Sequence, residues 1–438
     1  MATAELGIIP ACDRLSATLK TWLPWVGKGT LAITDQGLFA SSNFLLNVLL
    51  ARWLAPAEYG IFALAYSVLV LFLVFHTALL TSPMLVFGSG KYRDRFPEYM
   101  GILLRGHFAL MVPAAALLAA AAFLLGRLYS PEVERAFLAL AVAAPAILLL
   151  WLLRRAFYAR LDPRWAAAGG GVYLLILLAG GLALHAAGRL TPATGFLAMA
   201  AASFVTCLVL LGRLRPTLAT DSSFIRAVAT DHWRYGKWVA ASAGPGWVTD
   251  NIYYVCLPAW GGLAEAGALK ALLNLFMPAL QTMAALGVLL LPILVRDRDS
   301  GVPGAMKKTM KLVLALFFLG SACFLGLVWE FRFQIFHYLY AGRYAAYASW
   351  PLLLAGLLPF TQCITVVVGA ALGALERPDL GFWSCLGSAV IALVLGVPLV
   401  FALGIGGALG GLVVSYASLG MLLVFLFRRM DLKGKARL

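Results

Sequence analysis

Residues 57–60, Ala-Glu-Tyr-Gly, follow the first long apolar run of this chain, and residues 264–267, Ala-Glu-Ala-Gly, follow the seventh, 207 residues later. Each tetrapeptide lies in a short predicted turn that leads into another apolar run. At the same offset Asn43 corresponds to Asp250, so a polar position inside a run is repeated as well. The repeat predicts a chain built from two halves of the same topology.

The composition places these runs in a membrane. The chain has 438 residues, 62% of them hydrophobic and only 12% charged, with a mean hydropathy of +0.90. Soluble domains are about one quarter charged, so this chain lacks the polar residues to cover a surface in water. A membrane helix needs about 20 apolar residues, and the sequence contains twelve such runs. No room remains for a soluble catalytic or nucleic-acid-binding domain.

The net charge of +15 is explained by orientation. When the N-terminus is placed inside, seven of the 34 Lys and Arg residues lie on the outer side and the other 27 lie on the inner side. Because Lys and Arg accumulate in cytoplasmic loops, we expect both termini in the cytoplasm and no nucleic-acid partner. The expected spans are residues 29–53, 59–86, 101–126, 133–157, 165–187, 192–212, 236–260, 265–294, 309–329, 347–374, 380–402 and 405–427.

We therefore expect an all-α, multi-pass membrane protein of twelve helices in two six-helix lobes. Because six is even, both lobes begin inside and are related by an axis along the membrane normal. The expected parts are an interfacial segment (1–28), an N-lobe (29–212), a cytoplasmic linker that is partly an amphipathic helix (213–235), a C-lobe (236–427) and a basic tail (428–438).

No pattern for catalysis or for a bound cofactor is present. The six cysteines form no Cys-x-x-Cys pair, the five histidines have no metal-ligand spacing, and there is no P-loop, nucleophile elbow or dinucleotide motif. We expect no enzyme activity, no cofactor, no disulfide and no metal site.

Polar side chains inside the spans are candidate site residues because lipid penalises them. In the first span Gln36, Asn43 and Asn47 share one helix face, with Asp35 at its edge. This face predicts either the lining of a substrate cavity or hydrogen bonds between helices.

Asp250, in the seventh span, is expected near the bilayer centre. The segment Gly244-Pro245-Gly246 precedes it and removes a backbone donor, so we expect the helix to bend or unwind there. A flexible point beside a buried acid suits a proton- or cation-coupled transporter. The alternative role for this acid is a structural ion pair.

In the eighth span Lys270, Asn274 and Gln281 share one face. Three interpretations of Lys270 stay open: contact with an anionic substrate, a salt bridge to Asp250, and snorkelling to the outer surface.

Three arginines are further candidates for the cavity. Arg154 and Arg155 lie near the inner end of the fourth span, where orientation alone would also place them. Arg343 lies before the tenth span, at its outer end.

Three short motifs resemble those of Wzx-like polysaccharide flippases, which belong to the multidrug/oligosaccharidyl-lipid/polysaccharide (MOP) exporter superfamily. The first is Asn43-Phe44 with residues 50–62, Leu-Ala-Arg-Trp-Leu-Ala-Pro-Ala-Glu-Tyr-Gly-Ile-Phe. The others are residues 340–344, Tyr-Ala-Gly-Arg-Tyr, and residues 373–378, Gly-Ala-Leu-Glu-Arg-Pro.

The resemblance implies a V-shaped pair of lobes in the bacterial inner membrane. Such a protein carries an undecaprenyl-pyrophosphate-linked oligosaccharide from the cytoplasmic to the periplasmic leaflet, coupled to H⁺ or Na⁺. Its cavity cations would meet the pyrophosphate or acidic sugars, a role open to Lys270, Arg154, Arg155 or Arg343. The implied partners are the lipid-linked substrate, membrane lipids and a polysaccharide polymerase, and we expect a monomer.

Two alternatives remain open. A cation-coupled, MATE-like multidrug exporter of the same superfamily would use Asp35 or Asp250 as its cation site and would have an acidic, aromatic cavity. A membrane scaffold of a glycan-assembly complex would transport nothing, and it would have no reason to bear the cost of polar faces on three spans.

Overall fold

The computed structural model describes residues 34–300, 302–375 and 377–435, and these residues form helices and short connections without a strand. The expected interfacial segment 1–28 lies outside the described residues. The first half contains a helix over residues 34–53. It is followed by α2 (Pro56–His76), the π-helical η1 (Thr77–Thr81), α3 (Ser82–Phe87), α4 (Phe96–Leu128), α5 (Pro131–Ala159), α6 (Arg164–Ala186) and α7 (Pro192–Leu214).

The second half begins with the long helix α8 and contains several shorter pieces. Its elements are α8 (Ser222–Trp260), α9 (Leu263–Asp299), α10 (Ala305–Glu330), α11 (Arg332–Tyr340), η2 (Ala345–Tyr347), α12 (Trp350–Ala374), α13 (Pro378–Ile391), η3 (Ala392–Gly396), α14 (Val397–Leu403) and α15 (Ile405–Lys435).

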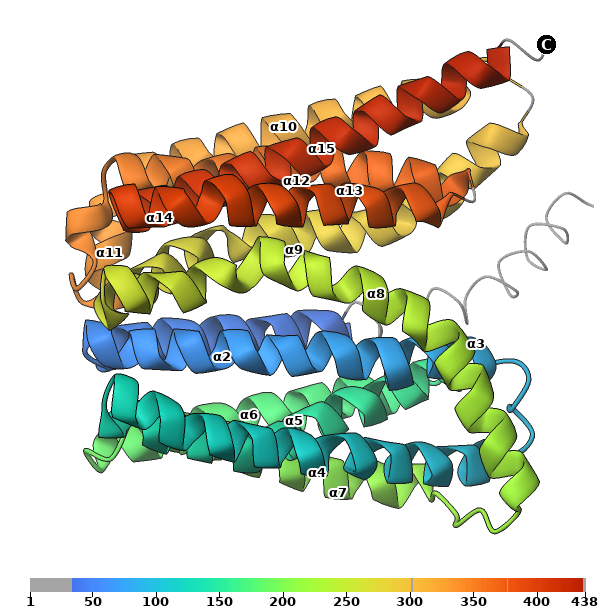
Figure 1. Cartoon of the computed structure of the whole chain (residues 1–438), viewed down its shortest axis with the longest axis horizontal. Coiled ribbons are helices and arrows are strands. Elements are labelled where there is room, and N and C mark those ends of the chain that lie inside the picture. Colours follow the sequence, from blue (N-terminus) through green and yellow to red (C-terminus); the bar gives the residue numbers. More distant parts are fainter. Residues whose placement is uncertain (1–33, 301, 376, 436–438) are drawn as a thin grey trace, which may run out of the picture.

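The helices form two bundles, as Figure 1 shows. In the N-lobe α5 packs against α4 and α7, and α6 packs against α7. In the C-lobe α12 packs against α9, α10 and α15. Helix α2 of the N-lobe lies against α8 and α9 of the C-lobe and joins the two bundles. The expected all-α fold of two helical lobes is confirmed.

Ten helical segments of the described chain are long and apolar enough to cross a membrane, and they coincide with ten of the twelve expected spans. The other two expected spans also lie on helices, over residues 34–53 and within α8. Neither of these helices is among the ten. The protein is a multi-pass membrane protein, whereas the count of twelve and the cytoplasmic termini stay predictions.

Helix α8 differs from the expected division into linker and span. Asp221 caps its first turn by accepting hydrogen bonds from the backbone N–H groups of Ser223 and Phe224. From there the helix continues to Trp260, so only residues 215–221 lie between α7 and α8. The expected amphipathic segment at the start of α8 and the expected apolar span after it therefore belong to one uninterrupted helix.

Prolines mark two places where long helices change their hydrogen bonding. Pro83 follows the π-helical turn η1, and Pro398 follows the π-helical turn η3. A proline lacks the N–H that would complete the regular helical ladder, and a local π turn is a common way to absorb such a change. The expected second and eleventh spans are thus composed of α-helix, π turn and α-helix.

The two repeated tetrapeptides lie where the lobes meet. Gly60 of α2 and Gly267 of α9 end the tetrapeptides. A Cβ atom added to Gly60 would lie 1.6 Å from the carbonyl oxygen of Leu263, and one added to Gly267 would lie 2.5 Å from that of Pro56. Only glycine permits such a close approach of two helices. The crossing is reciprocal, since each lobe contributes the same motif.

We predict that Gly60→Ala destabilises the protein by about 1–3 kcal/mol, because the new methyl group forces the two helix backbones apart. Gly181→Ala is the matched control: Gly181 is also a buried helical glycine, but a Cβ there meets nothing within 4 Å. Thermal unfolding of the purified proteins should show a lower midpoint for Gly60→Ala only. Equal midpoints would mean that the crossing is looser than described.

Candidate functional site

Two arginines connect the lobes at the expected outer end of the interlobe face, which is the surface where α2 of the N-lobe meets α8 and α9 of the C-lobe. Arg343 of the C-lobe donates to the backbone carbonyl oxygen of Leu54, and its second terminal nitrogen lies 3.4 Å from that of Trp53. Arg52 of the N-lobe donates in the opposite direction, to the carbonyl oxygen of Tyr338. Each guanidinium therefore binds the backbone of the other lobe. The structure places Arg343 in this contact, at the outer rim of the interlobe face.

Lys270 lies between the lobes. Its ammonium nitrogen is 4.2 Å from the ring centre of Tyr66 on α2 and 5.6 Å from that of Tyr254 on α8. Cation–π contacts of this kind hold an ammonium group without neutralising its charge. Among the described residues, no carboxylate lies within ion-pair distance of Lys270. The salt bridge to Asp250 is therefore not formed in this conformation.

Asp250 has a different partner. The hydroxyl group of Tyr416 on α15 donates to its carboxylate, so Asp250 is directed to a helix of its own lobe. The Asp250 side chain is exposed although it lies in the middle of an expected span. In the part of the chain that the structure describes, no Lys or Arg forms an ion pair with it. A carboxylate in this position can gain or lose a proton without breaking a salt bridge.

Asp35 and Arg154 form a buried ion pair in the N-lobe. The guanidinium of Arg154 donates twice to one carboxylate oxygen of Asp35, over 3.1 and 2.7 Å, and the hydroxyl group of Tyr158 donates to the other oxygen over 2.5 Å. Both charged side chains are buried, and the guanidinium also lies 3.9 Å from the ring centre of Phe39. The two charges cancel, so neither is available to a substrate or an ion in this conformation.

Arg155, next to this pair, is half-buried and lies over aromatic rings. Its guanidinium carbon is 4.8 Å from the ring centre of Trp151 and 5.7 Å from that of Tyr158. In the described residues it forms no ion pair with a carboxylate. Of the two candidate arginines on α5, Arg155 is therefore the one whose charge no described carboxylate balances.

The amide face of the first helix is divided between two roles. Asn47 is buried, accepts a hydrogen bond from the hydroxyl group of Tyr59 over 3.1 Å and donates to the carbonyl oxygen of Asn43 over 2.8 Å. Asn43 is half-buried and donates to Phe39 of its own helix. Gln36 is exposed and lies 3.4 Å from the hydroxyl group of Tyr158. Asn47 thus fits the hydrogen-bonding alternative, whereas Gln36 stays accessible.

On α9, likewise, one amide is buried and the other is exposed. Asn274 is buried, and its side-chain nitrogen has no hydrogen-bond partner among the described residues. Near it, the hydroxyl group of Tyr340 donates to the carbonyl oxygen of Ala271 over 2.9 Å. Gln281, two turns further toward the inner end, is exposed.

Helix α8 bends without unwinding. It remains helical through Gly244, Pro245 and Gly246, and Figure 1 shows that it changes direction along its length. Just after this segment the indole N–H of Trp247 donates to the carbonyl oxygen of Ser67 on α2, over 2.8 Å. The helix around the expected flexible point is thus in direct contact with the other lobe.

A buried histidine pair has no counterpart in the sequence-based predictions. The Nε2 atom of His76 lies 3.0 Å from the Nδ1 atom of His107, and both side chains are buried. His76 ends α2 beside the π turn η1, and His107 lies on α4. The two residues are 31 positions apart on different helices, so no spacing rule could have paired them.

Comparisons with known proteins agree on the fold. No family model and no curated protein sequence matches the chain. A multidrug resistance MATE family transporter of the MOP superfamily, in an inward-facing conformation, matches with a TM-score of 0.78 and 13% identity over 93% of this chain and 99% of that chain. The lipid II flippase MurJ, in an inward closed conformation, matches with a TM-score of 0.71 and 11% identity over 92% of this chain and 87% of that one.

A third structure, of a MOP superfamily transporter from Pyrococcus furiosus, has a TM-score of 0.65 and 12% identity over 94% of this chain and 96% of that chain. At these identities the likeness concerns the fold alone. The chain has the fold of MOP-superfamily transporters.

We predict that Asp35→Asn destabilises the protein by about 3 kcal/mol, because it leaves the buried Arg154 charge without a partner. Arg154→Met should have a similar effect for the converse reason. The double variant should lose less than the sum of the two, as measured by thermal unfolding in detergent. Additive losses would show that the two groups are not coupled, contrary to the geometry.

Proposed function

We propose that this protein is a flippase of the bacterial inner membrane. It carries an undecaprenyl-pyrophosphate-linked oligosaccharide from the cytoplasmic to the periplasmic leaflet by alternating access of its two lobes. The main support is the position of Lys270, a cation between the lobes that no described carboxylate neutralises. An unpaired cation in a low-dielectric surrounding attracts an anionic group strongly, and a pyrophosphate is such a group.

The positions of the two candidate acids leave the positive charge of Lys270 uncompensated. Asp35 is neutralised by Arg154, and Asp250 is bonded to Tyr416 of its own lobe. Neither carboxylate forms an ion pair with Lys270. A binding face for cationic drugs would need an unpaired acid with no free cation near it. Asp250 has no described cationic partner here, but Lys270, a cation without a described carboxylate partner, lies between the lobes as well.

The fold is compatible with this substrate class. One of the similar structures is a lipid II flippase, and another is a MATE multidrug transporter. The description of the Pyrococcus furiosus transporter links a reversed polarity of its binding pocket to a different function. We infer that the sign of the charge between the lobes bears on the substrate class in this fold, and here the unpaired Lys270 favours an anionic glycolipid over a cationic drug.

Asp250 is the proposed coupling site for H⁺ or Na⁺. It follows Gly244-Pro245-Gly246 on α8, has no described cationic partner, and is one helical turn from Tyr254, whose ring is 5.6 Å from the ammonium nitrogen of Lys270. A change in its protonation or ion binding would therefore act close to the substrate-binding cation. The expected partners are the lipid-linked substrate, membrane lipids and a polysaccharide polymerase, and the chain is expected to work as a monomer.

We predict that Lys270→Ala abolishes the flipping of a fluorescent undecaprenyl-pyrophosphate oligosaccharide in proteoliposomes, whereas Lys270→Arg retains much of it, because the positive charge is what binds the substrate. Lys237→Ala is the control, since Lys237 is an exposed lysine at the expected inner surface.

Asp250→Asn should remove the dependence of flipping on an ion gradient, because the amide cannot exchange a proton as the carboxylate does.

Full flipping by Lys270→Ala would contradict the proposed site. Gradient-driven export of a cationic dye by the same proteoliposomes, without flipping of the glycolipid, would instead support the multidrug exporter.

A further inference from the structure

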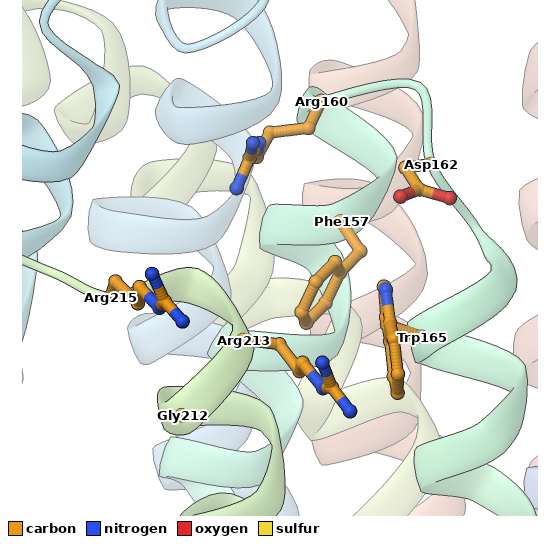
Figure 2. A pocket seen from close by; sticks show the side chains of 7 residues that line it. All are labelled: Phe157, Arg160, Asp162, Trp165, Gly212, Arg213 and Arg215. Atoms are coloured by element: carbon orange, nitrogen blue, oxygen red, sulfur yellow. The ribbon is translucent and has the colours of Figure 1, made fainter.

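A basic pocket lies at the expected inner surface of the N-lobe, away from the interlobe face. Its volume is about 320 Å³, and it is formed where α5 ends, α6 begins and α7 ends. Figure 2 shows the guanidinium groups of Arg160, Arg213 and Arg215 around the ring of Phe157, with Trp165 beside Arg213. The guanidinium carbon of Arg213 is 4.1 Å from the ring centre of Trp165.

The three arginines of this pocket have no carboxylate partner among the described residues. The one acid in the lining, Asp162, is bonded to Arg164 outside the pocket over 2.7 and 3.2 Å, which lowers the pKa of its carboxyl group. Asp162 is therefore ionised but already paired. The pocket has an excess of positive charge that the described chain does not balance.

Two residues at the edge of the pocket have a left-handed backbone conformation. Arg215 and Leu161 have φ angles of 48° and 56°, in the left-handed region that residues other than glycine rarely adopt. The segment after Arg215 is fixed, because the N–H of Thr217 donates to the carbonyl oxygen of Pro97 over 3.0 Å. A left-handed residue at the C-terminal end of a helix is a common cap, and these two caps fix the direction in which the chain leaves α5 and α7 beside the pocket.

The pocket also lies at the end of a lipid-facing surface. Phe204 and Leu208 of α7 are 58% and 55% exposed, and Gly212 follows them at the same helical spacing. Gly212 itself lines the pocket. Leu161 and Leu218, close in sequence to the pocket arginines, are exposed as well. This surface gives an acyl chain a path along α7 that ends where a headgroup would enter the pocket.

We propose that this pocket binds the phosphate headgroup of an anionic glycerophospholipid from the inner leaflet. Arg160, Arg213 and Arg215 bind the phosphate oxygens, and Phe204 and Leu208 contact an acyl chain. Basic pockets between membrane helices on the cytoplasmic side suit such headgroups, and guanidinium groups suit phosphate through paired hydrogen bonds. Orientation alone explains arginines on this side of the membrane, but it does not explain their convergence on one pocket.

The test is native mass spectrometry of the purified protein with phosphatidylglycerol, phosphatidylcholine or inorganic phosphate. The pocket variant is Arg213→Gln/Arg215→Gln. The matched control is Arg226→Gln/Arg234→Gln, which removes two exposed arginines of α8 that have no described carboxylate partner. We expect wild type and control to prefer phosphatidylglycerol, and the pocket variant to bind it about tenfold more weakly or worse.

Gly212→Phe provides a second variant that keeps every charge. Gly212 lines the pocket and a Cβ there meets nothing within 4 Å, so there is room for the first atom of a new side chain. We expect the ring to occupy part of the pocket and to weaken phosphatidylglycerol binding as well. Unchanged binding in both pocket variants would overturn the proposal. Displacement of the lipid by inorganic phosphate at equal concentration would also overturn it, because the ligand would then be a soluble anion.

Discussion

The close crossing of α2 and α9 is the constraint on which the arrangement of the lobes depends. Gly60 and Gly267 let the two helix backbones approach so closely that a single added Cβ would collide with a carbonyl oxygen. Arg52 and Arg343 bind backbone carbonyl groups across the same end. These contacts hold the lobes together at the expected outer side, and Figure 1 shows the bundles diverging toward the end that carries the C-terminus. The proposed alternating access requires this contact to separate when the protein opens outward.

The cost of charge in a membrane explains the distribution of the polar groups. Asp35 and Arg154 neutralise each other, Asn47 bonds to Tyr59, and the amide groups that stay exposed lie toward the inner half. Arg155, Asp250 and Lys270 have no ion-pair partner among the described residues. Lys270 differs from the other two because it lies between the lobes, beside aromatic rings of both. A charge that the described chain leaves uncompensated at such a cost requires a reason, and an anionic substrate supplies one.

Sequence periodicity could predict the helices and the two lobes because apolar length and charge asymmetry are local properties. The repeat also located α2 and α9, although it could not reveal that their glycines touch. The sequence could not predict which polar side chains bond to each other. Asp35 and Arg154 are 119 residues apart, and one polar helix face can line a cavity or contact a neighbouring helix. The absence of a Lys270–Asp250 bridge from the described contacts likewise depends on the direction of each side chain, which spacing does not fix.

The proposed transport by alternating access requires that the outer contact at Gly60 and Gly267 opens. The most direct measurement places spin labels at Leu128 and Phe333, which are exposed at the expected outer ends of the two lobes, and records their distance distribution in proteoliposomes. We expect one short distance without substrate and a second, longer population once an undecaprenyl-pyrophosphate oligosaccharide and an ion gradient are present. A single distribution that does not respond to either would contradict the opening of this contact.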